Sequence, residues 1–194
     1  SVLPDLDVNG TSEYTMDELM LKYLDEKLVL NNSSLTLNKG SKITNAIVSI
    51  DPSDLIFNNA EDNSATILME VNDGSTLTIQ GDGSLYAEGG HYSAGIGSGY
   101  TGFDSAAGAA NNIIINSGNI TAKSGESDCA GIGGGLRQDV NNIIINGGNI
   151  NAIATRSNAI GSTSRDGQGV LKGLEINGGN ITAIGGYYGG GIGG

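Results

Sequence analysis

Short apolar segments recur along this chain, and glycine, serine and asparagine separate them. The two most similar stretches read NNIIINSGNITA at residues 111–122 and NNIIINGGNINA at residues 141–152. Further copies read LTLNKGSKIT (35–44), LTIQGDGSLYA (77–87) and LEINGGNITA (174–183), and the Asn or Gln after each triplet gives spacings of 42, 36, 30 and 31 residues. Each segment is too short for a typical helix, so the pattern predicts a repeated unit of short strands.

The columns of the aligned copies separate an inner face from an outer face. The first and third positions of the triplet are always Leu or Ile, whereas the middle position accepts Thr and Glu as well as Ile. Side chains of a strand alternate between its faces, so the first and third positions point inward and the middle one points outward. In the second segment an inward Ile or Leu and an inward Ala enclose an outward residue. The outward residues of this segment are Thr44, Tyr86, Thr121, Asn151 and Thr182.

A third apolar segment, AGIGSG at 94–99 and AGIGGG at 130–135, lies between the copies. Three inward-facing strands in each unit predict a parallel β-solenoid, in which equivalent residues of successive coils lie about 4.8 Å apart. The 33 glycines would suggest disorder if no apolar pattern accompanied them. Asn116, Asn146 and Asn177 are expected to form an amide ladder at one corner.

The phrases GGNITA (178–183) and AGIGGG (130–135) resemble the glycine-rich right-handed parallel β-helix repeats of bacterial secreted and cell-surface proteins. The resemblance is clear over residues 77–194 and weak over 28–76. We therefore expect an all-β fold, a right-handed parallel β-helix of about five coils with three strands per coil, over residues 28–194. The resemblance implies an adhesin-like or carbohydrate-binding role, although the same fold carries polysaccharide lyases and passive stalks.

The first 27 residues are expected to form a loop and a capping α-helix. The stretch MDELMLKYLDE at 16–26 places its apolar residues on one helical stripe. Thr15 and Glu18 fit a capping box at its start. We expect this helix to cover the first coil, because an open strand edge at the end of a solenoid requires a cap.

The segment DVNGTSEYTMDE at 7–18 resembles one calcium loop of a dockerin or EF-hand. Ser12 stands where such a loop normally needs Gly, and a second loop is missing. A polar turn before the helix is therefore the alternative to a weak calcium site. The six residues at the ligand positions are Asp7, Asn9, Thr11, Glu13, Thr15 and Glu18.

The net charge of −12 lies almost entirely in residues 1–90, which hold 15 acidic and 4 basic residues. This charge argues against nucleic acid as a partner. No apolar run reaches about 18 residues, so no membrane insertion is expected. The single cysteine, Cys129, excludes an internal disulfide. The chain begins with Ser and shows no signal peptide, and we expect a mature or trimmed part of a secreted protein.

The last residue, Gly194, stands midway through another copy of the GIGG phrase. We therefore expect the parent protein to continue. An uncapped strand edge at this end could pair edge to edge with another chain.

Aromatic and polar side chains gather at the corner that follows the alanine column. Tyrosine rings stack on sugars, and amides and carboxylates bind hydroxyl groups, so this corner is a candidate carbohydrate site. Its tyrosine pairs lie three coils apart, about 14 Å by the stacking distance, which suits a chain of sugars. The alternative is that these are ordinary corner residues. The candidates are Tyr86, His91, Tyr92, Asp128, Asn158, Tyr187 and Tyr188.

Charged residues at another corner, after the GIG phrase, are the candidates for catalysis. Arg137 and Asp139 of one coil and Arg165 and Asp166 of the next would form an acid/base or calcium-bridged site if stacking brings them within about 5 Å. Surface ion pairs on loops of unequal length are the alternative. No zinc-type ligand cluster occurs, and His91 has no Ser or Cys partner phrase.

The favoured function is a non-catalytic, secreted or cell-surface bacterial module that binds a polysaccharide or a glycoprotein glycan as part of a longer protein. The first alternative is a polysaccharide lyase or glycoside hydrolase that acts on uronate-rich polymers. The second alternative is a purely structural stalk. No cofactor other than calcium is expected. A Thr121–Asn151–Thr182 ladder also resembles ice-binding solenoids, but it has only three rungs and one is Asn.

Overall fold

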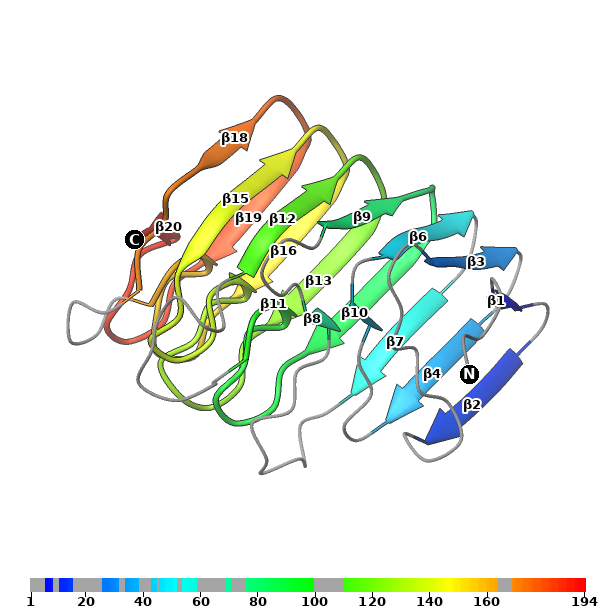
Figure 1. Cartoon of the computed structure of the whole chain (residues 1–194), viewed down its shortest axis with the longest axis horizontal. Coiled ribbons are helices and arrows are strands. Elements are labelled where there is room, and N and C mark those ends of the chain that lie inside the picture. Colours follow the sequence, from blue (N-terminus) through cyan, green and yellow to red (C-terminus); the bar gives the residue numbers. More distant parts are fainter. Residues whose placement is uncertain are drawn as a thin grey trace.

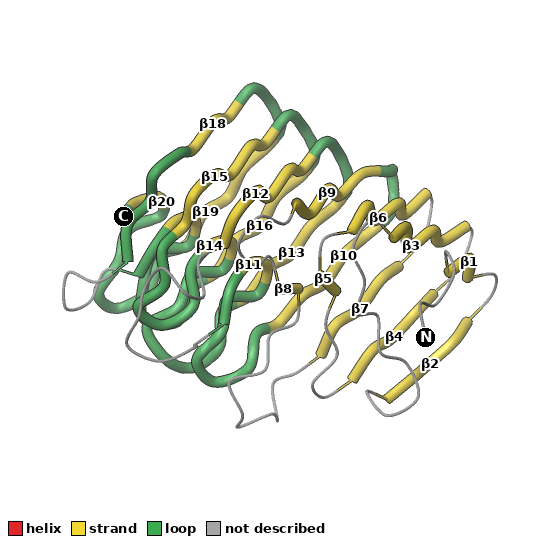
Figure 2. Tube along the Cα trace, in the orientation of Figure 1, coloured by secondary structure: helices red, strands yellow, loops and turns green. Residues whose placement is uncertain are grey.

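The computed structural model describes residues 76–99, 110–163 and 169–194, and of the earlier residues it describes only the backbone of the strands. The described residues form twenty short strands in three parallel sheets. Within each sheet the strands lie side by side from the N-terminal to the C-terminal end (Figure 1). Figure 2 shows the strands in rows that loops connect at the corners. From β3 onward, successive strands belong in turn to three sheets, here called A, B and C, so one strand of each sheet forms a winding of a β-solenoid.

Sheet A contains β1 (Leu6–Val8), β3 (Glu26–Asn31), β6 (Ala46–Asp51), β9 (Thr76–Gln80), β12 (Ala110–Ile115), β15 (Val140–Ile145) and β18 (Leu174–Ile176). Sheet B contains β2 (Thr11–Thr15), β4 (Ser34–Asn38), β7 (Asp54–Asn58), β10 (Ser84–Glu88), β13 (Asn119–Lys123), β16 (Asn149–Ile153) and β19 (Asn180–Ile184). Sheet C contains β5 (Ile43–Thr44), β8 (Met69–Glu70), β11 (Ile96–Gly97), β14 (Ile132–Gly133), β17 (Ile160–Gly161) and β20 (Ile192–Gly193).

The alternation of inward and outward residues agrees with the prediction from the triplets. Ile113 and Ile145 are fully buried, whereas the middle residues Ile114 and Ile144 are half-buried on the outer face. Register pairs align Ile113 with Ile143 and Ile115 with Ile145. Because a shift of one residue would turn every side chain to the other face, these columns fix the register of sheet A.

The core is a continuous column of aliphatic side chains inside the windings. Leu77, Leu85, Ile120 and Ile132 are at most 1% exposed and belong to one cluster with the inward residues of the neighbouring windings. Burial of each such side chain contributes about 1.5–3 kcal/mol, which offsets the cost of ordering these short strands. A single winding cannot bury its own apolar face, so the stack rather than the winding is the stable unit.

Sheet C brings the backbones of neighbouring windings unusually close. Gly97, Gly133 and Gly161 follow its isoleucines, with φ values of 140°, 134° and 129°. A Cβ atom built on Gly133 would lie 2.0 Å from the carbonyl oxygen of Gly161. Only glycine fits this position, because its backbone angle and the space around it both exclude a side chain.

The predicted amide ladder is present at the corner between sheets A and B. Asn146 Nδ2 donates to Asn116 Oδ1 at 2.9 Å, and Asn177 Nδ2 donates to Asn146 Oδ1 at 2.9 Å. Gly118, Gly148 and Gly179 have positive φ values at this corner. Each ladder bond connects one winding to the next.

Two predictions about the early windings are wrong. The expected count of five coils is not supported, because sheets A, B and C contain seven, seven and six strands among the described residues. The LTL triplet at 35–37 lies in sheet B, where Leu35 pairs with Leu55, and Ile43 lies in sheet C beside Met69. The error arose because strands β3, β6 and β7 lack the Asn-Gly corner that marks the later repeats.

The expected capping helix falls on residues 16–26, of which 16–25 lie outside the described residues and Glu26 begins β3. Thr15, expected as its N-cap, is the last residue of β2, which pairs with β4. The backbone of 11–15 forms its hydrogen bonds with β4. The capping pattern of Thr15 and Glu18 is local in sequence, so it does not predict this pairing with a distant strand. Within the described ranges the chain contains no α-helix, and none of its segments there meets the length and apolarity that a membrane-spanning helix requires.

Candidate functional site

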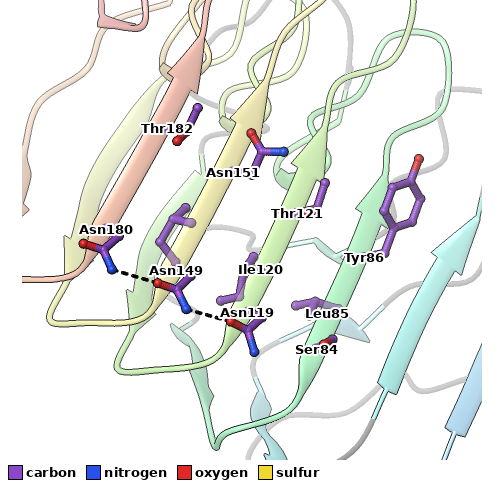
Figure 3. A pocket seen from close by; sticks show the side chains of 11 residues that line it. Ser84, Leu85, Tyr86, Asn119, Ile120, Thr121, Asn149, Asn151, Asn180 and Thr182 are labelled. Atoms are coloured by element: carbon purple, nitrogen blue, oxygen red, sulfur yellow. Dashed lines mark hydrogen bonds between the residues drawn. The ribbon is translucent and has the colours of Figure 1, made fainter.

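An open groove of about 590 Å³ lies on the outer face of sheet B. It crosses the four neighbouring strands β10, β13, β16 and β19, which are fully described (Figure 3). The intervening Leu85, Ile120 and Ile150 complete its described lining, which contains no charged residue. Its polar side chains come from the same two positions of each strand, namely Ser84, Asn119, Asn149 and Asn180 in one row and Tyr86, Thr121, Asn151 and Thr182 in the other.

The first row forms a second amide ladder along the groove. Asn149 Nδ2 donates to Asn119 Oδ1 at 2.8 Å, and Asn180 Nδ2 donates to Asn149 Oδ1 at 2.9 Å. All three side chains are exposed. A primary amide has two N–H donors and two acceptor lone pairs, so each rung can make further hydrogen bonds to a ligand after the ladder bonds form.

The second row follows two residues along each strand (Figure 3). The Asn151 side chain lies between the outward threonines of β13 and β19. Its Oδ1 atom is buried and accepts no hydrogen bond in the described part of the chain. An unpaired buried acceptor costs free energy, so a donor that reaches it after a small rotation of the amide would stabilise the site.

Tyr86 lies at the end of the groove farthest from β19, and its hydroxyl donates to Glu88 Oε2 at 2.6 Å. Lys123 Nζ lies 2.7 Å from Glu88 Oε1 and balances the carboxylate charge. Burial, followed by the hydrogen bond and the charge of Glu88, raises the pKa of Tyr86 to about 12. The phenol is therefore neutral over the physiological range, and its ring is held in place by this network.

The corner after sheet B contains the other predicted aromatic residues. His91 and Tyr92 form an edge-to-face pair with ring centroids 4.3 Å apart, and Tyr187 and Tyr188 form another at 4.7 Å. The Arg156 guanidinium lies 5.5 Å from the centroid of the Tyr188 ring. Tyr187 is 84% exposed. These residues lie beyond the strands and do not line the groove, so Tyr86 is the one member of the predicted set that does.

Two predicted carbohydrate-binding residues are buried in the corner. Asn158 Nδ2 donates to the carbonyl oxygen of Ser162, and Asn158 Oδ1 accepts from the Gly190 N–H at 2.8 Å. Asp128 is 4% exposed, and its Oδ1 lies 3.7 Å from Arg156 Nε. The contacts of Asn158 with Gly190 and of Asp128 with Arg156 connect neighbouring windings, and both side chains are buried.

The corner proposed for catalysis is described only in part. Asp139 is buried, and its Oδ1 accepts the Val170 N–H at 3.0 Å while its Oδ2 lies 3.0 Å from Lys172 Nζ. Both carboxylate oxygens therefore hold the next winding in place. Arg137 lies in a tight turn with φ of 62°. Arg165 and Asp166 lie outside the described residues.

The predicted calcium ligands lie in the least described part of the chain. Asp7 belongs to β1, and Thr11, Glu13 and Thr15 belong to β2, whose backbones alone are described. Asn9 and Glu18 lie outside the described residues. Among the residues that the structure does describe, no three His, Cys, Asp or Glu side chains form a cluster that could hold a metal ion. The calcium site remains a prediction.

Sequence reasoning missed Asn119, Asn149 and Asn180. Their signal is the Asn in the phrase GNI, which recurs in three successive repeats directly before the inward Ile. The sequence predicts an amide ladder only for the Asn three residues earlier, such as Asn116, whereas both positions form ladders.

Three segments of the chain, residues 77–100, 113–136 and 174–194, match the family model described as a beta helix repeat. They cover the windings β9–β11, β12–β14 and β18–β20. The match and the stacked windings together support a β-helix repeat protein. This fold occurs in enzymes and in non-enzymes. No match was found among the curated proteins or among the solved structures.

Proposed function

We propose that this protein is a non-catalytic module that binds a polysaccharide in the groove on the outer face of sheet B. The observation that carries the proposal is the pair of polar rows that cross four windings of an open groove. Amide and hydroxyl groups donate and accept hydrogen bonds, as sugar hydroxyls do. The ring of Tyr86 at one end offers an apolar surface to the C–H face of a sugar.

The arrangement suits binding better than catalysis. The described lining of the groove contains no carboxylate, histidine or cysteine, whereas most glycoside hydrolases use a pair of carboxyl groups. Asp139, the described carboxylate of the alternative site, already contacts Lys172 and the Val170 N–H. The proposal includes a location outside the cell, on its surface or secreted, because polysaccharides and glycoprotein glycans are found there.

Retention on immobilised polysaccharides tests this function. Thr121 lies in the middle of the groove, and Thr121→Arg places a long charged side chain across it. We expect the wild-type protein to be retained by at least one plant, mucosal or cell-wall polysaccharide and the variant to lose at least about 90% of its binding, a loss of about 1.4 kcal/mol or more.

The matched control is Thr78→Arg. Thr78 occupies the outward middle position of β9 in sheet A, so this change adds the same side chain to a different face. Circular dichroism verifies that both variants fold. Failure of the wild-type protein to bind any polysaccharide, or equal loss of binding in both variants, would overturn the proposed function.

A further inference from the structure

The groove repeats along the solenoid axis with the spacing of the windings. Asn119, Asn149 and Asn180 are register partners, and so are Thr121, Asn151 and Thr182. Neighbouring strands of a sheet lie about 4.8 Å apart, so the groove spans about 14 Å from β10 to β19. A ligand that extends along this direction meets equivalent polar groups at every step.

Among the residues that the structure describes, no charged side chain lines the groove, although the chain carries a net charge of −12. Close to its edge, the charge of Glu88 is balanced by Lys123 at 2.7 Å. A polyanion such as a polyuronate would meet no cation among the described lining residues and would be repelled by the acidic residues 1–90. The lining therefore favours a neutral ligand.

From these observations, and on the basis of the proposed function, we propose that the ligand is a neutral, extended β-1,4-linked polysaccharide that lies across the strands with one sugar per winding. In β-1,4-linked chains of glucose or mannose both linkage bonds of each ring are equatorial, so the chain is nearly straight. Its rise per sugar is close to the spacing of β-strands. An α-1,4-linked glucan coils instead and leaves the row of equivalent groups after one or two sugars.

The amide and hydroxyl side chains suit the alternating orientation of the sugars. Successive rings of a β-1,4-linked chain are turned over, so the groove meets opposite edges in turn. Asn and Thr side chains both donate and accept hydrogen bonds, so each rung can serve either edge. The rise per sugar and the distance between neighbouring strands differ slightly. Over four windings this difference is too small to move a sugar away from its Asn and Thr side chains.

Calorimetric titration with sugar chains of defined length tests this alignment. We expect the affinity for β-1,4-linked gluco- or manno-oligosaccharides to rise about three- to tenfold with each added sugar, as for one or two new hydrogen bonds, and to level off at about four sugars. We expect α-1,4-linked gluco-oligosaccharides of equal length and polygalacturonate to bind at least about tenfold more weakly.

A variant at the end of the groove sharpens the test. Thr182 belongs to β19, the last strand of the groove, so Thr182→Arg blocks one winding and leaves three. The affinity of this variant is expected to level off at about three sugars, with unchanged binding of shorter chains, whereas Thr78→Arg keeps the wild-type profile.

The two proposals fail in different ways. Binding of α-1,4-linked chains or polygalacturonate with equal affinity, or a plateau at two sugars, would overturn the one-sugar-per-winding alignment and leave the polysaccharide-binding function standing. Absence of binding to every polysaccharide would overturn both.

Discussion

The central windings and the last winding carry the same residue types in the same columns, yet they bury them to different degrees. Ile145 of β15 is fully buried, whereas its register partner Ile176 of β18 is 43% exposed. In sheet C, Ile160 is fully buried and Ile192 is 47% exposed. Each central strand pairs on both sides, but β18, β19 and β20 pair on one side only among the described strands. Burial thus depends on neighbouring windings more than on the residue itself.

The largest difference between the two regions is expected for a glycine of sheet C. In Gly133→Ala the added Cβ would lie 2.0 Å from the carbonyl oxygen of Gly161, at a φ of 134°. Strain and overpacking together should lower the free energy of unfolding by about 3–6 kcal/mol. Urea unfolding monitored by circular dichroism measures the loss.

Gly193 occupies the same column in the last winding and provides the matched control. A Cβ there meets the side-chain oxygen of Asn158 at 3.1 Å. Gly193→Ala should therefore cost about 1–2 kcal/mol, less than Gly133→Ala, because the Asn158 side chain can shift slightly where a backbone cannot. Equal losses in Gly133→Ala and Gly193→Ala would contradict the close approach of the windings.

A smaller difference is expected for the isoleucines of sheet A. Ile145→Ala removes a fully buried side chain and should lower the free energy of unfolding by about 2–5 kcal/mol. Ile176→Ala removes a side chain that is already 43% exposed and should cost about 1–2 kcal/mol. The same unfolding experiment compares them, and a loss in Ile176→Ala as large as in Ile145→Ala would show that the last winding is covered in solution.

The smallest effect is a shift in the titration of Tyr86, which reports on the environment of a central winding. Its pKa of about 12 lies above the ordinary value of 10.0, mainly because of burial and secondly because of Glu88. Folding therefore favours the neutral phenol, and this stabilisation is present below pH 10 and is lost as the pH rises from about 10 to about 12. Glu88→Gln should move the pKa of Tyr86 part of the way towards 10.

Phenolate absorbance measures this shift, with Tyr86→Phe as the reference that identifies the signal. A pKa of Tyr86 that does not change in Glu88→Gln would show that the hydrogen bond between the Tyr86 hydroxyl and Glu88 is not formed in solution.

The sequence predicts the strands and register of the later windings correctly, but it does not predict which sheet contains each early strand. From Leu77 onward, glycine corners and Ile-rich triplets define a register in which a shift of one residue would expose the core. Strands β3, β6 and β7 have varied residues and no such corners, so the sequence pattern aligns LTL at 35–37 with the triplets of sheet A although it lies in sheet B. Alternation alone identifies a strand but does not say which of three sheets contains it.

The candidate site was predicted only in part for a related reason. The outward direction of Tyr86, Thr121, Asn151 and Thr182 follows from a period of two, and the structure agrees. Asp128 and Asn158 are predicted to face a ligand, but both are buried. Backbone groups at a corner need hydrogen-bond partners, and the Asn158 side chain binds the Ser162 carbonyl oxygen and the Gly190 N–H. Polar residues at a corner look alike in a sequence whether they bind the backbone or face the solvent.

The most direct test of the stacked windings is the formation of an engineered disulfide. Cys129 is changed to Ser, the residue at the equivalent positions 93 and 157, so that two new cysteines are the only thiols. Thr121 and Asn151 are register partners on adjacent strands, which places their Cα atoms about 4.8 Å apart and within the range of a disulfide. Ile153 lies two residues farther along β16.

Mild oxidation followed by mass spectrometry should show a disulfide in the folded Thr121→Cys/Asn151→Cys variant. The Thr121→Cys/Ile153→Cys variant should remain reduced, because its Cα atoms are more than about 7 Å apart. Cross-linking of the second variant as readily as the first, or of neither, would contradict the stacking of β13 on β16 and with it the groove that they share.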